Sequence, residues 1–184
     1  MVLKNRHLVV VSVAALLLVG AAVFLYRGAI SHGFSAREEP WAIEAFVAKR
    51  LRRLATGTEV KHLQNPVPVS PHAIAEGRDH FADHCAVCHA NDGSGKTPIN
   101  EGLYPPAPDL REPGTRDLSD GEIFNIIRNG IRFTGMPGWG GEGKENWKLV
   151  LFIRHLPDLS EDDLRRMKEM NPENRSNETR EHEH

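Results

Sequence analysis

Two cysteines and a histidine stand together near the middle of the chain, in the run Cys85-Ala86-Val87-Cys88-His89. This spacing is typical of a covalent haem attachment site, because two thiols one helical turn apart can reach the two vinyl groups of one porphyrin edge. The adjacent imidazole can then bind the iron from beneath the ring. The motif predicts one haem c, bound covalently through Cys85 and Cys88, with His89 as an axial metal ligand.

Two other chemistries use the same residue types. A Cys-x-x-Cys pair can be a thioredoxin-like redox centre, but that requires a neighbouring βαβ pattern, and the sequence shows none. A zinc site could use Cys85, Cys88, His89 and His84, but a second ligand pair at zinc-finger spacing is missing. The sequence therefore favours haem attachment over both.

A second axial ligand is sought among the four methionines. Met1 is the initiator, and Met167 and Met170 fall in a charged stretch near the C-terminus. Met136 lies in a Thr-Gly-Met-Pro-Gly-Trp run, where glycines allow the backbone to approach a haem face and proline fixes the turn. A buried loop methionine that fills a gap in the core is the alternative. With the haem motif upstream, the expected metal ligands are His89 and Met136, a pair that raises the reduction potential.

From about Ser70 to Leu156 the sequence resembles the class I monohaem cytochromes c, which are small all-helical electron carriers. The likeness rests on four features in order: a helix that runs into the Cys-Ala-Val-Cys-His motif, a proline-rich loop, the Gly-Met-Pro loop, and an aromatic C-terminal helix. The arm before Ser70 and the tail after Pro157 do not match the common core of the family. The resemblance implies an all-α, class I cytochrome c fold wrapped around one covalent haem.

The resemblance also implies roles for the proline-rich loop, Tyr104 to Leu110. In the family a proline carbonyl accepts the ring N–H of the haem histidine, and such hydrogen bonds fix the orientation of the ring. By analogy Pro108 is expected to do this, and Leu110 to contact the haem. A plain surface loop is the alternative.

Three further residues are candidates for contact with the haem. Trp139 lies just after the expected ligand, where it could pack on the haem edge or donate to a propionate. Arg111 and Arg132 are also propionate candidates, although each could equally be a solvated charge.

The stretch from Leu8 to Tyr26 is uncharged and almost wholly apolar. As a helix it would span roughly 28 Å, close to the hydrocarbon thickness of a bilayer. Residues 1–30 are therefore expected to be a membrane anchor, with a cleaved signal sequence as the alternative. The basic residues Lys4 and Arg6 precede the stretch and favour a cytoplasmic N-terminus. Both interpretations predict a haem domain in the bacterial periplasm; the anchor would be single-pass, in the inner membrane.

Three segments follow the anchor. Residues 31–69 are expected to form a helical arm (Pro40 to Ala55) and a proline-rich linker. A solvated spacer is the preferred interpretation of the arm, although its arginines could face phospholipid head groups and its apolar side could dock. Residues 70–158 form the expected haem domain, and residues 159–184 a short helix followed by a disordered tail. The tail histidines His182 and His184 are expected to be solvated rather than metal-bound.

Within the haem domain, short signals mark the helix ends. Ser70 is expected to cap a helix toward His84, Ser119 to open a capping box, and Ser160 to cap the last helix. An apolar helix is expected from Trp147 to Leu156. The resemblance further implies that Gly77 lies where the first and last helices of the domain cross.

Charge is divided along the chain: residues 1–65 carry nine Lys and Arg against four Asp and Glu, and the remainder fourteen against twenty-one. This gives no support for nucleic-acid binding. With both axial positions of the haem filled, no small-molecule substrate is expected, and the chain is predicted to be an electron carrier rather than an enzyme. Its partners would be redox proteins. A haem sensor, a peroxidase-like enzyme with a displaceable ligand, and an electron-transfer subunit of a membrane oxidoreductase remain alternatives.

Overall fold

The computed structural model describes residues 2–31, 35–141 and 143–172. The chain forms two compact units, Met1–Glu38 and Glu39–His184. In the described ranges all regular secondary structure is helical, which confirms the expected all-α class. The expectations for the tail after residue 172, including its two histidines, concern residues outside the described part.

The first unit contains one long helix, α1 (Val2–Ser31). Its segment Val9–Gly28 has a mean hydropathy of 2.7, and none of this segment is buried in the protein. The helix is long and apolar enough to cross a membrane, as the sequence predicts. A signal sequence near the N-terminus would have the same properties.

The second unit begins with an arm of two helices, α2 (Ala42–Ala55) and α3 (Thr58–Lys61). Helix α2 starts two residues later than expected, because Trp41 has an extended backbone (φ −60°, ψ 146°) and occupies the N-cap position in place of Pro40. The short helix α3 was not predicted. In the linker that follows, the Asn65 side-chain amide donates to the Trp147 carbonyl (3.0 Å) and fixes the linker to the last core helix.

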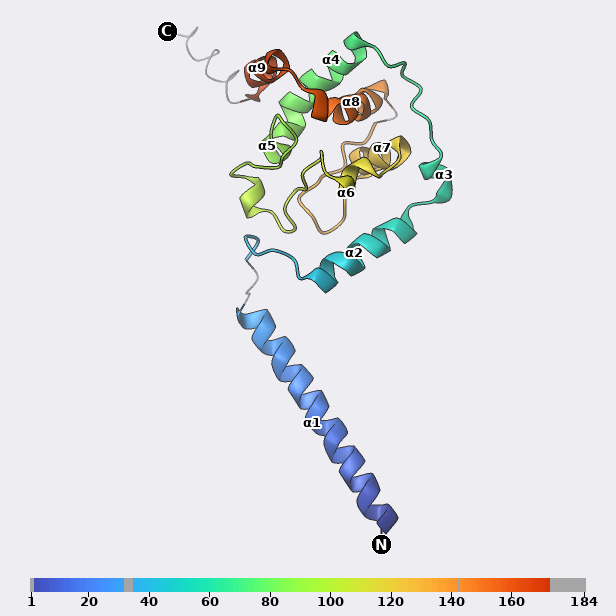
Figure 1. The fold of residues 1–184 in the computed structure, drawn as a ribbon, viewed down its shortest axis with the longest axis vertical. Coiled ribbons are helices and arrows are strands. Elements are labelled where there is room, and N and C mark those ends of the chain that lie inside the picture. Colours follow the sequence, from blue (N-terminus) through green and yellow to red (C-terminus); the bar gives the residue numbers. More distant parts are fainter. Residues whose placement is uncertain (1, 32–34, 142, 173–184) are drawn as a thin grey trace. The chain divides into compact units, whose positions relative to one another are not determined.

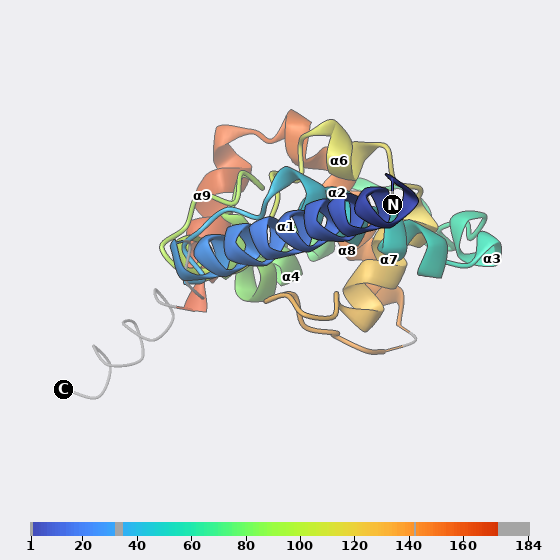
Figure 2. The same cartoon turned by 90° about the horizontal axis from the view of Figure 1, so that it is seen from below.

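The core is built on the crossing of α4 (Pro71–His80) and α8 (Lys144–His155), which lie against each other in both views (Figures 1 and 2). A Cβ atom on Gly77 would overlap the Lys148 carbonyl oxygen and stand 3.0 Å from Cβ of Phe152. The rings of Phe81 and Phe152 meet beside this point, with centroids 5.1 Å apart. The expectation of a glycine against aromatics at a helix crossing is confirmed.

The ends of these helices are only partly as expected. Ser70 accepts from the Ala73 N–H and caps α4 as predicted. The predicted helix from Trp147 to Leu156 starts earlier, at Lys144. It passes after His155 into a 3-10 turn, η3 (Leu156–Asp158), where proline removes a backbone donor.

Two helices close the core on the side of α8: α6 (Pro113–Arg116) and α7 (Asp120–Asn129). The predicted capping box between Ser119 and Glu122 is present at the start of α7. Phe124 of α7 stacks on Trp147 of α8, with ring centroids 4.1 Å apart and an interplanar angle of 11°. This stack joins α7 to the α4–α8 pair.

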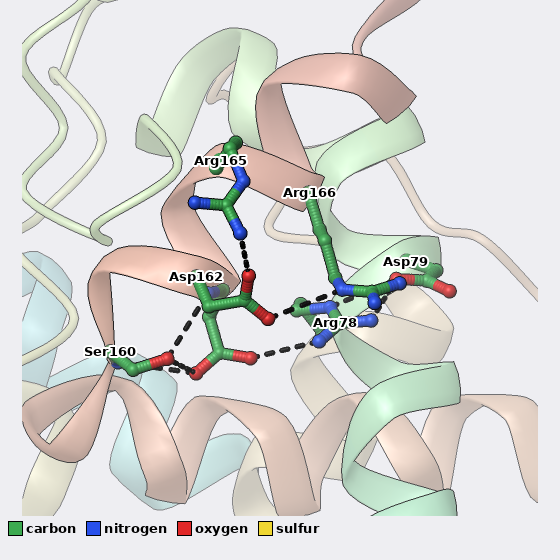
Figure 3. A network of polar contacts seen from close by, with 7 residues as sticks. Arg78, Asp79, Ser160, Asp162, Arg165 and Arg166 are labelled. Atoms are coloured by element: carbon green, nitrogen blue, oxygen red, sulfur yellow. Dashed lines mark hydrogen bonds and ion pairs between the residues drawn. The ribbon is translucent and has the colours of Figure 1, made fainter.

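The last described helix is α9 (Glu161–Met170), which begins with a capping box between Ser160 and Asp163. Figure 3 shows Arg78 and Asp79 of α4 facing the start of α9; the Arg78 guanidinium donates to the Asp163 carboxylate at 2.8 Å. Met167 of this helix is fully buried in the core. Helix α9 therefore covers α4 and belongs to the folded domain.

Candidate functional site

The cysteine motif lies where α4 stops being an α-helix. After His80 the chain forms a π-helical turn, η1 (Phe81–Cys85), and then the short helix α5 (Ala86–His89). The chain thus stays helical toward His84 as expected, but its last turn is π-helical rather than α-helical. Phe81 is only 1% exposed, so the wide turn is held against the core. Such π-turns are frequent at functional sites.

A cavity of about 350 Å³ brings together all but one of the site residues expected from the sequence: Cys85, Cys88, His89, Pro108, Met136 and Trp139. Its volume falls within the range of ligand pockets. Three segments line it, which we call the proximal wall (residues 84–89), the side wall (103–108) and the distal wall (131–139).

Leu110, the remaining predicted haem contact, is buried in the hydrophobic core. Of the two arginines proposed for a propionate, Arg111 forms ion pairs with Asp109 (2.6 Å) and Asp92 (3.2 Å). Neither Arg111 nor Arg132 is among the described residues that line the cavity.

Both cysteines of the proximal wall are free thiols. Burial, with a further contribution from Cys88, raises the pKa of the Cys85 thiol to about 12, and burial also raises the pKa of Cys88. A thioredoxin-like centre needs the opposite, a cysteine whose pKa is lowered so that it is a thiolate. The raised pKa values therefore give no support to a thioredoxin-like centre.

The zinc alternative also gains no support from the geometry. Among the described residues, no group of three or more His, Cys, Asp or Glu side chains is placed to hold a metal ion.

The His89 imidazole has its Nδ1 side in the protein interior. Its Nδ1 atom is buried and forms no hydrogen bond of normal geometry within the described protein. Burial lowers the pKa of His89, and the Pro108 backbone carbonyl opposes this by favouring the protonated ring. A neutral imidazole has a free nitrogen lone pair and can bind a metal. The residues present therefore fit a haem: two thiols, a neutral imidazole and an apolar cavity.

The side wall is positioned by Asn100, which sequence reasoning missed. This residue, in the 3-10 turn η2 (Asn100–Gly102), is only 7% exposed. Its amide nitrogen donates to the carbonyls of Gly95 and Ala107, and its side-chain oxygen accepts from the Ala107 N–H. Because Gly95 in turn donates to the His89 carbonyl (2.8 Å), Asn100 connects the proline-rich loop to the cysteine motif. A single asparagine in a loop has no spacing pattern that could have revealed this.

The distal wall is a loop between α7 and α8 that closes on itself. The Ile131 N–H donates to the Met136 carbonyl (3.1 Å), and the Thr134 hydroxyl donates to the Ile131 carbonyl (2.8 Å). The same hydroxyl accepts from the Met136 N–H (3.1 Å). Gly138 packs against the end of α7 rather than against the cavity, because a Cβ atom on Gly138 would stand 2.8 Å from the Asn129 carbonyl group. Thr134 is thus a positioning residue for Met136.

Strained backbone occurs near both expected ligands. In the described ranges the only non-glycine residues with positive φ are Ala90 (φ 60°) and Phe133 (φ 62°). Ala90 directly follows His89, and Phe133 precedes Met136 by three residues. Residues in sparsely populated conformations concentrate at functional sites, where the surrounding structure holds them.

Trp139 reaches the cavity from the distal wall, and its indole is 41% exposed. Its ring meets that of His84 edge to face, with centroids 5.3 Å apart. His84 also lines the cavity and pairs with Asp83 at 3.3 Å, so it connects the proximal and distal walls. The aromatic contact between Trp139 and His84 could not be predicted without the fold.

A helical domain with a Cys-x-x-Cys-His turn and a methionine loop around one apolar cavity defines a c-type cytochrome domain. Comparison with protein families agrees: residues 72–153 match the family model described as cytochrome c oxidase, cbb3-type, subunit III. The chain therefore contains a c-type cytochrome domain and, in addition, an N-terminal apolar helix that fits a membrane anchor. A comparison with curated proteins gave no match.

Proposed function

We propose that this chain is a membrane-anchored carrier of single electrons, with one haem c in a domain on the periplasmic side of a bacterial inner membrane. The observation that carries the proposal is the cavity shared by the cysteine motif and Met136, segments about fifty residues apart that no local sequence rule brings together. When bound, the haem would supply a one-electron iron couple.

Each wall has its own task in this proposal. Cys85 and Cys88 would tether the haem, and His89 would bind the iron as a neutral imidazole, with the Pro108 carbonyl beside its buried ring. Met136 provides the second axial ligand, which Thr134 holds in place through the Met136 N–H. With both axial positions occupied the site would leave no room for a substrate, and the chain would transfer electrons without catalysing a reaction itself.

Electron partners are proposed to dock where the cavity meets solvent. Two large apolar side chains that line the cavity are exposed, Val87 by 47% and Trp139 by 41%, and Phe133, in the same loop as Trp139, is 92% exposed. Exposed aromatics are common anchors of protein interfaces. A Phe133→Ala variant should keep its spectrum and slow electron transfer to a protein partner, whereas transfer to a small inorganic oxidant should be unchanged.

A second candidate function is supported by the family model. In this alternative the chain is an electron-transfer subunit of a larger membrane oxidoreductase, because the matching family is described as subunit III of cbb3-type cytochrome c oxidase. Isolation of the full chain from mildly solubilised membranes separates the two: a stable complex of fixed composition supports the subunit, and a chain that elutes alone supports the free carrier.

The covalent haem is tested by producing the chain in cells that attach c-type haem. Wild type should retain haem on a denaturing gel, and the double variant Cys85→Ser, Cys88→Ser should lose it. A single Val87→Ala variant, which changes the motif but neither thiol, serves as the control and should keep the haem. Retention of haem by the double variant would contradict covalent attachment.

A further inference from the structure

Helix α2 exposes its most apolar side to solvent. Ile43, Val47 and Leu54 share one face at i, i+4 and i+11, and their side chains are 70%, 46% and 82% exposed. Phe46 and Leu51 flank this face and are also exposed. We call these five residues the apolar stripe. In a surface helix of a globular protein such a stripe normally points into the core.

The opposite side of α2 is the one that contacts the rest of its unit. Trp41, Ala45 and Arg52 repeat the same spacing on that side, and they are the half-buried positions of the arm's first helix and its cap. Glu44 accepts a hydrogen bond from the Tyr104 hydroxyl at 2.7 Å, which connects α2 to the side wall of the cavity. The helix is therefore turned so that its apolar stripe points away from the haem domain.

The charges around the apolar stripe are mainly basic. Helix α2 contains four basic residues and only one acidic residue, Glu44. The Arg50 guanidinium lies over the Phe46 ring, 5.7 Å from its centroid, within the apolar side. Long arginine stems can lie along apolar surface while their charged heads remain in a polar layer. An apolar stripe with an aromatic ring and flanking arginines is the pattern of helices that lie in a membrane interface.

The chain length also keeps α2 close to a bilayer surface. Ten residues, 32–41, separate the last residue of α1 from the first residue of α2. Even fully extended, such a segment reaches at most roughly 35 Å. If α1 spans the membrane, as proposed above, the apolar stripe is confined to the neighbourhood of that membrane, and anionic lipids there would attract its arginines.

We propose that α2 is an interfacial helix, which inserts the apolar stripe into the headgroup and acyl boundary of an anionic bilayer. Arg50 and Arg53 then contact lipid phosphates, and the Glu44–Tyr104 hydrogen bond connects the inserted helix to the side wall of the haem cavity. The haem domain would be held at the membrane surface rather than free to swing on a linker. This inference rests on the proposed anchoring by α1, but not on the axial ligands.

The test uses the full, haem-loaded chain in vesicles of phosphatidylcholine with or without phosphatidylglycerol. A nitroxide is attached at Leu54→Cys in the apolar stripe, and at Ala48→Cys as the matched control. Ala48 is an exposed residue of the same helix that shares the side of Trp41 and Ala45. The readout is the ratio of collision rates with oxygen, which concentrates in lipid, and with a water-soluble nickel complex.

In vesicles with phosphatidylglycerol, the ratio at Leu54 should be several-fold higher than at Ala48. The double variant Arg50→Gln, Arg53→Gln should reduce this difference. Equal ratios at the two positions in protein that floats with the vesicles would overturn the inference and leave the anchor intact. Protein that does not float would overturn the anchor and the inference together. A Leu54 label that is shielded only after a membrane protein is added would assign the apolar stripe to a protein partner and contradict a lipid interface.

Discussion

The proximal and distal walls of the cavity are held in different ways. The proximal wall continues from α4 and rests on core residues such as Phe81 and Ala82, each 1% exposed. The distal wall is a loop that is held by hydrogen bonds within itself and by one from the Trp139 N–H to the Ile127 carbonyl of α7 (3.0 Å), and it carries Phe133, 92% exposed. We therefore expect the cysteine motif and His89 to depend on the α4–α8 core, and Met136 to depend mainly on its own loop and on α7.

The largest loss of stability should come from a substitution at the α4–α8 crossing, on which the proximal wall rests. Gly77→Ala places a methyl group on the Lys148 carbonyl, where a backbone must move, and should lower the free energy of unfolding by about 3 kcal/mol. Denaturant unfolding of the haem-loaded protein measures this. Gly114→Ala is the control, because a Cβ atom there meets nothing within 4 Å. Equal effects of the two variants would show that the α4–α8 crossing is not tight.

A smaller loss is expected where the side wall meets the proximal wall. Asn100→Ala leaves the half-buried Ala107 N–H and the Gly95 carbonyl without their side-chain partner, and should cost about 2 kcal/mol. The free energy of unfolding is again the measurement. Asn129→Ala, which removes only exposed side-chain hydrogen bonds to Asn125, should change it by less than about 0.5 kcal/mol. A similar loss of stability in both variants would show that Asn100 does not position the side wall.

The contribution of the α9–α4 contact to the stability of the fold should decrease at low pH. Hydrogen bonds from Ser160 and then Arg78 lower the pKa of Asp163 from its ordinary 3.8 to about 2. A lowered folded-state pKa stabilises the fold above the ordinary value, and this contribution is lost as the pH falls from near 4 toward 2. Asp163→Asn should cost about 1 kcal/mol at neutral pH and weaken the acid dependence.

Asp162→Asn is the matched control for this acid dependence, since Asp162 pairs with Arg165 and Arg166 on the exposed side of α9 (Figure 3). The loss of stability at low pH should be the same in the Asp162→Asn variant as in wild type. If the Asp163 variant keeps the full acid dependence, the Arg78–Asp163 contact does not stabilise the domain.

The smallest effect should come from the distal wall. Phe133→Asn removes an exposed side chain from a left-handed backbone position that asparagine adopts more readily. The free energy of unfolding should remain unchanged or rise by up to about 1 kcal/mol. Thermal unfolding of the haem-loaded protein measures this change in stability. A loss of more than 1 kcal/mol would mean that the ring supports the fold, and the contrast between the walls would disappear.

The proximal wall could be predicted from the sequence because its chemistry is local: Cys85, Cys88 and His89 lie within one turn. The capping box at Ser119 and the helix cap at Ser160 could be predicted for the same reason. The wide turn before Cys85 could not be foreseen, since a π-turn has no simple residue pattern.

Long-range packing accounts for what the sequence did not show. The burial of Asn100 depends on loops that fold back through Gly95 and Ala107. Met167 lies in a charged stretch, and its burial depends on where α9 meets α4. The orientation of α2 was equally hidden, because the hydrophobic pattern of a helix reveals an apolar side but not the direction in which that side points.

The most direct test of the proposed carrier is the visible spectrum of the protein, with and without carbon monoxide, for wild type and Met136→Ala. With His89 and Met136 on the iron, reduced wild type should be low-spin and should not bind carbon monoxide. Met136→Ala should bind it while the haem remains covalently attached, because only the distal wall has changed. Binding of carbon monoxide by wild type, unaltered by the substitution, would contradict the account and favour a sensor or a peroxidase-like enzyme.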